Sequence, residues 1–289
     1  MIMKFLGLGD NAIDYYVNKG VMYPGGNAVN TAAHAALLGH EAAYLGNFGD
    51  DEYAGIIRDG LNFAGASCSL CPVVHGSHTK ICLYDMIDGE RHFLGIDTGK
   101  LWSGPVRLTP EILESIGKYE LIHSCAYAKI ANEVYKLSAL PAVFTYDFSE
   151  KEKYHTSEYL DLVCSDLDLA LFSCSHASRQ EIIDFTRIVH RHGARHVLIT
   201  IGNRGQYFSN GSIGIWNPAY YVKARDTTGA GDAFLACFVT QLYGHGWHKG
   251  QIMPEEPIRA ALRAAAAYSS ENCRKEGSFG YRAMKKENC

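Results

Sequence analysis

The stretch Asp226-Thr227-Thr228-Gly229-Ala230-Gly231-Asp232-Ala233-Phe234 decides how this chain is interpreted, because a glycine-rich turn runs into an apolar segment. Gly229 and Gly231 allow consecutive backbone N–H groups to point into one concavity. The apolar residues 233–242 predict a helix, and the free N–H groups and dipole at its start add positive potential. A turn of this kind binds anions, most often phosphate.

Asp232 is the unusual member of this stretch, because a carboxylate repels phosphate. One interpretation is chemical: Asp232 takes a proton from a hydroxyl while Gly229, Ala230 and Gly231 hold the phosphoryl group in transfer. The alternative is structural, since aspartate is common at helix starts. An isolated Gly-x-Gly-Asp would favour the structural role, whereas the longer string favours the chemical one.

A second stretch near the N-terminus reads Pro24-Gly25-Gly26-Asn27-Ala28-Val29-Asn30-Thr31-Ala32. Together the two stretches resemble, in the expected order, the two signatures of the ribokinase-like sugar kinases, also called the phosphofructokinase-B type. The segments between them fit in order and rough spacing, so the resemblance covers nearly the whole chain. Within the family, residues 9–15 (Gly-Asp-Asn-Ala-Ile-Asp-Tyr) followed by residues 25–30 are most similar to the fructoselysine 6-kinase branch.

Composition limits the class of protein. The chain has 289 residues, of which 47% are hydrophobic. This content is enough for a sizeable core and argues against disorder. A net charge of −4 gives no electrostatic case for nucleic acid or membrane surfaces. No apolar run approaches the ~20 residues of a membrane span. The nine cysteines are typical of reduced thiols, so we expect a cytoplasmic protein.

One cysteine and histidine cluster has zinc-like character: Cys68-x2-Cys71-x3-His75-x2-His78. Its spacing is shorter than that of a Cys2His2 finger, and the segment continues into a strand-like stretch. We therefore expect unliganded thiols and surface histidines, with a metal site as the alternative.

Strand-like and helix-like segments alternate along the chain, which predicts an α/β fold with a mostly parallel central sheet and helices on both faces. The absence of a linker predicts one kinase domain over residues 1–289. The predicted strands are 5–9, 43–48, 121–124, 143–147, 169–173 and 197–201. The predicted helices are 26–38, 53–64, 110–116, 128–137, 178–192 and 257–273.

Two segments, 14–24 and 79–95, break this alternation. The second alternates around a turn at residues 86–90 that contains Asp88-Gly89, a hairpin signal. The resemblance implies that both segments form a small β lid over the sugar. Lids in this family often pair across a homodimer, and the sequence does not decide whether this one does.

Polar residues follow the first predicted strand and open the first predicted helix. Asp10 and Asn11 stand at a strand's carboxyl end, where ligands bind in open α/β sheets. Asn27 and Asn30 are three apart and share a helix face. The resemblance implies sugar contacts, with turn and helix capping as the alternative for Asp10 and Asn27. The candidate sugar-binding residues are Asp10, Asn11, Gly25, Gly26, Asn27, Asn30 and, from the lid, Arg91, for which surface exposure is the alternative.

The stretch Thr200-Ile201-Gly202-Asn203-Arg204-Gly205 resembles the nucleotide element Thr-x-Gly-x-x-Gly of the family. The resemblance implies nucleotide contacts for Thr200, Gly202 and Gly205, although the pattern alone would predict an ordinary hairpin turn. It also implies that Thr228 and Gly277 flank the ATP.

One family feature is missing. Many members carry Asn-x-x-Glu after the strand at 169–173, where it helps to organise magnesium, but this chain reads Ser173-Cys174-Ser175-His176. Mg²⁺ would then be held by ATP and water, or by another carboxylate such as Glu181. The sequence does not identify the metal ligands. It also does not decide whether a monovalent cation binds near Asp226 and Thr228.

These features predict an ATP-dependent sugar kinase, and the resemblance favours the 6-hydroxyl of fructoselysine as acceptor. A Walker-type kinase is excluded by the absence of Gly-x-x-x-x-Gly-Lys-Ser/Thr, and a protein kinase by the absence of its motifs. Fructose, ribose or adenosine are alternative acceptors, and a non-catalytic sensor is the alternative class. A Rossmann dehydrogenase is rejected, because Ala12 stands where Gly-x-Gly-x-x-Gly would need its third glycine.

Overall fold

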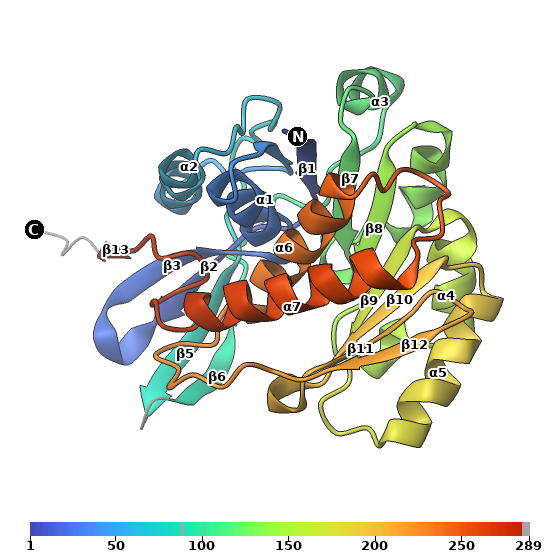
Figure 1. Cartoon of the computed structure of the whole chain (residues 1–289). Helices are drawn as coiled ribbons and strands as arrows, with labels where there is room; N and C mark the ends of the chain where they lie inside the picture. Colours follow the sequence, from blue (N-terminus) through green and yellow to red (C-terminus); the bar gives the residue numbers. More distant parts are fainter. Residues whose placement is uncertain (88–89, 101, 285–289) are drawn as a thin grey trace, which may run out of the picture.

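The computed structural model describes residues 1–87, 90–100 and 102–284. Its central sheet has eight strands in the order β12-β11-β10-β9-β8-β7-β1-β4. The six strands from β10 to β4 in this order pair in parallel. At the other edge, β11 pairs antiparallel with β10 on one side and with β12 on the other. The predicted α/β fold with a mostly parallel sheet is therefore confirmed (Figure 1).

The strands are β1 (Lys4–Leu8), β2 (Ala12–Tyr16), β3 (Val21–Gly25), β4 (Glu41–Leu45), β5 (Ile81–Ile87), β6 (Glu90–Asp97), β7 (Leu121–Cys125), β8 (Val143–Asp147), β9 (Leu169–Ser173), β10 (His196–Thr200), β11 (Gln206–Ser209), β12 (Gly214–Asn217) and β13 (Ala283–Met284). The α-helices are α1 (Asn27–Leu37), α2 (Glu52–Ala64), α3 (Pro110–Ile116), α4 (Ser157–Val163), α5 (Arg179–Arg191), α6 (Ala230–Gly244) and α7 (Glu255–Asn272). The 3-10 helices are η1 (Val17–Lys19), η2 (Ala126–Ala128), η3 (Ala131–Ala139), η4 (Glu152–Tyr154), η5 (Cys164–Asp166) and η6 (Gly202–Arg204).

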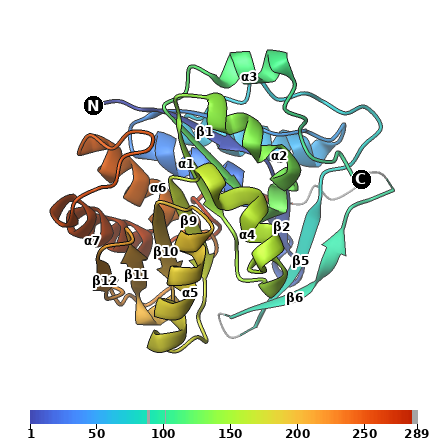
Figure 2. The same ribbon diagram turned by 90° about the vertical axis from the view of Figure 1, so that its right-hand side faces the viewer.

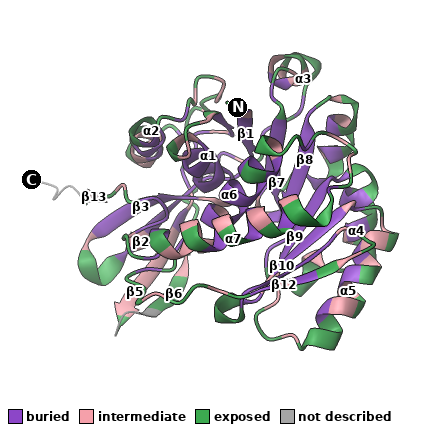
Figure 3. Ribbon diagram, viewed as in Figure 1, coloured by how far each residue is buried: buried purple, intermediate pink, exposed green. Residues whose placement is uncertain are grey.

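Helices cover both faces of this sheet because successive strand residues point to opposite sides. Phe5 packs into the core shared with α1, α2, α6 and α7, whereas its neighbour Leu6 packs into the core shared with η3, α4 and α5. Figure 2 shows α6 and α7 on one side of the strands and α4 and α5 on the other. In Figure 3, α6 is buried almost throughout, whereas α5 and α7 expose their outer faces.

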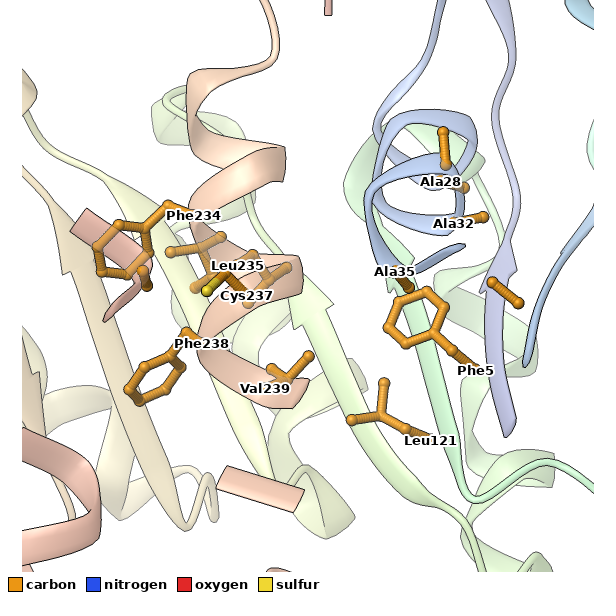
Figure 4. Packing of buried hydrophobic residues seen from close by; sticks show 14 of the residues in the cluster. Phe5, Ala28, Ala32, Ala35, Leu121, Phe234, Leu235, Cys237, Phe238 and Val239 are labelled. Carbon is orange, nitrogen blue, oxygen red and sulfur yellow. The ribbon is translucent and has the colours of Figure 1, made fainter. Parts of the chain in front are cut away.

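The helix α1 lies unusually close to β1, which fixes the polar residues at its start. A side chain at Gly7 would bring its Cβ within 2.1 Å of the Ala28 carbonyl oxygen, so only glycine fits there. Small residues on α1, including Ala32 and Ala35, face the same core as Phe5, and α6 supplies larger side chains to it (Figure 4). This packing sets the starts of α1 and α6 beside the end of β1.

A second sheet has the order β13-β3-β2-β5-β6 and occupies the positions predicted for the lid (Figure 1). β2 pairs antiparallel with β3 and parallel with β5, and β5 pairs antiparallel with β6. The predicted Asp88-Gly89 turn lies outside the described residues.

Two further findings differ from the predicted elements. The helix predicted at 128–137 is the 3-10 helix η3, and its buried residues Ala131, Val134 and Leu137 recur every three positions, the period of a 3-10 helix. The short helix α4 was not predicted; the Thr156 side chain caps it by accepting from the Tyr159 N–H. Across the described residues, no helix is both long and apolar enough to cross a membrane.

Candidate active site

A cavity of about 1070 Å³ lies between the two sheets, at the carboxyl ends of the central strands and the start of α6. It brings together most of the residues predicted for the site. Those that line it are Asp10, Gly26, Asn27, Asn30, Arg91, Thr200, Gly202, Thr228, Gly229, Ala230, Gly231 and Asp232.

Four predicted site residues do not line the cavity and serve its surroundings instead. Asn11 donates its amide to the Tyr44 hydroxyl and to a backbone carbonyl, so it supports the loop behind the site. Gly25 and Gly205 allow close approach: a Cβ would lie 2.8 Å from the Asp14 carboxylate at Gly25 and 2.1 Å from a backbone oxygen at Gly205. Gly277 donates its N–H to a buried carboxylate.

The glycine-rich turn forms an open helix start. Gly229 is the N-cap of α6 with φ 70°, a left-handed conformation that favours glycine. A Cβ at Gly231 would meet nothing within 4 Å, so the start of α6 is open to the cavity. Backbone N–H groups in the first turn of a helix lack intrahelical acceptors, and they can therefore bind the oxygens of an anion.

Asp232 stands at this helix start, and amides from α1 hold it. Asn27 donates to its Oδ1 at 2.8 Å and Asn30 donates to its Oδ2 at 2.7 Å. Burial raises the pKa of Asp232 to about 8, although the hydrogen bond from Asn30 opposes the shift. In its ionised form, a carboxyl with this pKa is a stronger proton acceptor than an ordinary aspartate.

Asn27 is itself oriented by a fully buried histidine that the sequence did not point to. Its Nδ2 donates both to Asp232 and, at 2.8 Å, to Asp147 at the end of β8. Its Oδ1 lies 2.7 Å from His123 Nε2, so that nitrogen carries the proton, and His123 Nδ1 accepts from Thr145 at 2.9 Å. Burial lowers the pKa of His123 to about 3, so the ring is neutral and the amide orientation is fixed.

Asp147 is a second carboxyl in the cavity wall that sequence reasoning missed. Burial raises its pKa to about 7, and the nearby carboxylates of Glu150 and Asp10 add to the shift. Its position as the last residue of a predicted strand was the available signal, because ligands bind at the carboxyl ends of such strands.

Asp226, at the other end of the glycine-rich stretch, is saturated with hydrogen bonds. Thr228 donates its N–H at 2.9 Å and its hydroxyl at 2.6 Å. Gly277 donates its N–H at 3.0 Å, and Tyr16 donates its hydroxyl from β2 at 2.8 Å. Burial alone would raise the pKa of Asp226, but these hydrogen bonds outweigh it and lower the pKa below its ordinary value.

The end of the cavity near the second sheet is suited to a polyhydroxylated ligand. Asp10 is buried and accepts from the Ala28 N–H at 3.2 Å. Asn30 Oδ1 is buried and has no hydrogen-bond partner among the described residues, so it can accept from a ligand hydroxyl. Arg91 lies over the Tyr84 ring, 5.1 Å from its centroid, on the second sheet.

The opposite end is a shallow channel between β10 and α7. Thr200, Gly202 and Asn203 line one side, and Ala266 and Ser270 line the other. This channel reaches the glycine-rich turn, because the Ser269 hydroxyl donates to the Ala230 carbonyl at 2.8 Å. A ligand in this channel would therefore reach the start of α6.

The candidate metal ligands are not gathered around this cavity. Glu181 accepts from the Ser178 N–H in a capping box at the start of α5. In the cysteine and histidine cluster at residues 68–78, the Cys71 thiol donates to the Tyr44 carbonyl, and His75 Nδ1 lies 3.1 Å from the Asp50 carboxylate. Within residues 1–87, 90–100 and 102–284, no group of three or more His, Cys, Asp or Glu is placed to hold a metal ion.

Residues 3–280 match the family described as pfkB family carbohydrate kinase. The chain is 32% identical over 281 residues to fructosamine kinase FrlD of Bacillus subtilis, covering 96% of this chain and 94% of the relative. It is 28% identical to the fructoselysine 6-kinase of Shigella flexneri, covering 91% of this chain and 97% of the relative.

Solved structures show the same fold at low sequence identity. The fructokinase with bound ATP from Xylella fastidiosa superposes with a TM-score of 0.79 at 19% identity, covering 96% of this chain and 94% of that one. The aminoimidazole riboside kinase of Salmonella enterica, solved with its riboside and an ATP analogue, gives 0.76 at 18% identity, covering 96% and 95%.

Proposed function

The chain belongs to the pfkB family of carbohydrate kinases and is a phosphotransferase that acts on a sugar hydroxyl, and from that premise we propose that its acceptor is the 6-hydroxyl of fructoselysine. One observation carries the choice of Asp232 as base. Its carboxylate stands at the open start of α6, while Asn27 and Asn30, from the predicted sugar-binding stretch, hold both its oxygens.

The reaction follows from this arrangement. The sugar binds against Asp10 and Asn30, with one hydroxyl at Asp232. Asp232 takes the proton from this hydroxyl, whose oxygen attacks the γ-phosphorus of ATP in line, while the bond from that phosphorus to the bridging oxygen of the β-phosphate breaks and ADP leaves. The N–H groups at the start of α6 stabilise the charge that develops on the phosphoryl oxygens, because they are fixed before the reaction begins.

ATP fits the channel that leads to the glycine-rich turn, with its phosphates at Gly229–Gly231 and its base between Gly202 and α7. In the part of the chain that the structure describes, no three His, Cys, Asp or Glu side chains gather into a site for Mg²⁺. Mg²⁺ would therefore be held chiefly by the ATP phosphates and water, where it offsets phosphate charge. We also propose that the two sheets act as one kinase domain, because both line this cavity.

The finer choice of fructoselysine has two supports. The first is the similarity to a fructosamine kinase and to fructoselysine 6-kinases. The second is electrostatic: Asp147 lines the cavity with a raised pKa, and no cation lies within 4 Å of it among the described residues. The protonated amine of a fructosamine would supply that cation, whereas fructose and ribose would not.

ATP consumption by the pure protein with Mg²⁺ tests the proposal across fructoselysine, fructose, ribose, adenosine and no acceptor. We expect turnover with fructoselysine at least ~10-fold above the other acceptors in kcat/KM. A preference for another sugar would keep the mechanism and discard the substrate. Absence of turnover with every acceptor would contradict the proposed kinase activity and favour the alternative, a non-catalytic sensor.

A further inference from the structure

One stretch of the cavity wall takes no part in the phosphoryl transfer. Glu150 and Lys151 follow β8 closely and line the cavity together with Tyr127, which belongs to η2. The two residues are adjacent and opposite in charge. Both are exposed, so a ligand in the cavity can reach them.

The backbone in front of this pair is strained. Ser149 has φ 65°, and among the described non-glycine residues only Lys129 shares such a left-handed conformation. This conformation is unfavourable for a residue with a Cβ and persists where the surroundings require it. The Ser149 N–H donates to Asp147 Oδ1 at 2.7 Å, so the turn both orients Asp147 and carries the chain along the cavity wall.

Glu150 is fixed in position and ionised. The Tyr127 hydroxyl donates to its two oxygens at 3.0 and 3.3 Å, and the Ser149 hydroxyl lies 2.7 Å from the Tyr127 hydroxyl. Burial opposes ionisation, but the hydrogen bonds from Ser149 and Tyr127 outweigh it and lower the pKa of Glu150. An anion with a defined position therefore stands at the cavity wall.

Lys151 is held by the same tyrosine. Its ammonium lies over the Tyr127 ring, 5.2 Å from the centroid, in a cation–π contact. Among the described residues, no carboxylate lies within 4 Å of this ammonium, so Lys151 forms no direct ion pair with Glu150, although its charge helps to lower the pKa of Glu150. Tyr127 thus contacts two opposite charges that lie side by side without a direct ion pair.

We infer that Tyr127, Glu150 and Lys151 form a subsite for the zwitterionic head group of an amino acid attached to the sugar. Glu150 accepts hydrogen bonds from the α-ammonium group, and Lys151 donates to the α-carboxylate. The inference rests on the proposed function and deepens it. Asp10 and Glu150 both act on the Asp147 carboxyl, so this wall adjoins the sugar end of the same cavity, and a bare sugar has no group for it.

The test compares two acceptors with ATP and Mg²⁺: fructoselysine, and the fructosamine of a simple alkylamine that lacks both head-group charges. The readout is the ratio of their kcat/KM values. We expect the wild-type protein to favour fructoselysine at least ~10-fold, and Glu150→Gln or Lys151→Gln to lower the ratio ~10-fold each. Glu152→Gln and Lys153→Gln are matched controls on η4 outside the cavity wall, and they should keep the ratio.

Modified acceptors assign each charge. Acetylation of the α-amine should abolish the effect of Glu150→Gln, and amidation of the α-carboxylate should abolish that of Lys151→Gln. A strong preference for fructoselysine that neither variant lowers would overturn the subsite and leave the proposed function intact. Equal use of both acceptors would overturn the subsite as well, and turnover with neither acceptor would overturn the proposed substrate with it.

Discussion

The two ends of the glycine-rich stretch carry the same side chain in opposite environments. Asp226 receives hydrogen bonds from Thr228, Gly277 and Tyr16, and these lower its pKa. Asp232 receives two amide hydrogen bonds, but burial prevails and raises its pKa to about 8. A short segment of chain therefore holds one carboxylate that stays ionised and one that can take up a proton.

The contrast assigns a role to each residue. Asp226 joins the second sheet, the turn and the loop after α7, so its charge is part of the structure. Asp232 lies at the cavity with fewer hydrogen bonds, as the proposed base requires. When environments push the pKa values of two carboxyls apart, the difference separates the acid–base group from the supporting one.

Exchange of the base should give the largest effect. Asp232→Asn is expected to lower kcat by ~10²- to 10⁴-fold while ATP still binds. The raised pKa means that the folded protein holds this proton more tightly than the unfolded chain, so ionisation between about pH 4 and 8 destabilises the fold. The unfolding temperature of the variant relative to the wild type should therefore be more favourable at pH 9 than at pH 6, even though its amide meets the donors Asn27 and Asn30.

Kinetics and thermal unfolding at pH 6 and pH 9 would measure both effects. Asp184→Asn, on the exposed side of α5, is the control and should change neither. A variant with near-normal turnover would remove Asp232 from the mechanism.

Exchange of the supporting carboxylate should act on stability. The substitution Asp226→Asn places an amide NH2 group, itself a donor, against groups that donate to Asp226. We expect it to lower the free energy of unfolding by about 2–4 kcal/mol at pH 7. Tyr16→Phe removes one donor and should cost about 1 kcal/mol. The stabilisation by Asp226 is present above its unfolded pKa and disappears as the pH falls through its lower folded pKa, so the difference should shrink in acid.

Urea unfolding at pH 7 and pH 3 measures these differences. Equal stability of Asp226→Asn and the wild type at pH 7 would contradict the supporting role.

The orientation of Asn27 offers a more moderate test. His123→Leu removes the donor that fixes its amide, and we expect kcat to fall ~10-fold. His123→Gln retains a donor of similar reach and should recover part of the loss. Steady-state kinetics of both variants separates orientation from packing, because equal losses in the two would indicate packing alone.

The smallest effect concerns the pH profile. In the wild type, kcat/KM should rise with pH and level off above about pH 8, as the base of the free protein loses its proton. Asp147→Asn removes a neighbouring negative charge, so the rising limb should move to lower pH. If kcat/KM rises over the same pH range in Asp147→Asn as in the wild type, another group controls this rise. Rates measured both with fructoselysine and with fructose would distinguish this shift in pH dependence from a loss of substrate binding.

The structure brings together residues that local sequence patterns singled out. The glycine turn, Asp10 and Asn27 line one cavity, because strand ends and helix starts can be located from hydrophobic pattern and turn chemistry. The fold class followed from the same pattern.

Residues that act through distant contacts were missed. His123 lies inside a buried strand and looks like core, and its contact with Asn27 spans 96 positions. Tyr16 meets Asp226 across 210 positions. Nothing in the local pattern at either residue encodes such a partner. Glu150 and Lys151 likewise look like ordinary surface charges until the cavity is seen.

The bond between Tyr16 and Asp226 also has a consequence for biosynthesis. At ~5–20 residues per second, the ribosome makes Asp226 roughly 10–40 s after Tyr16, a delay set by the 210 positions between them. Until then, the strands that carry Tyr16 lack the anion that receives its hydroxyl, and Asn27 lacks Asp232. The nascent chain therefore completes the proposed site only after residue 232 has been made, and a chain that ends before it lacks the proposed base.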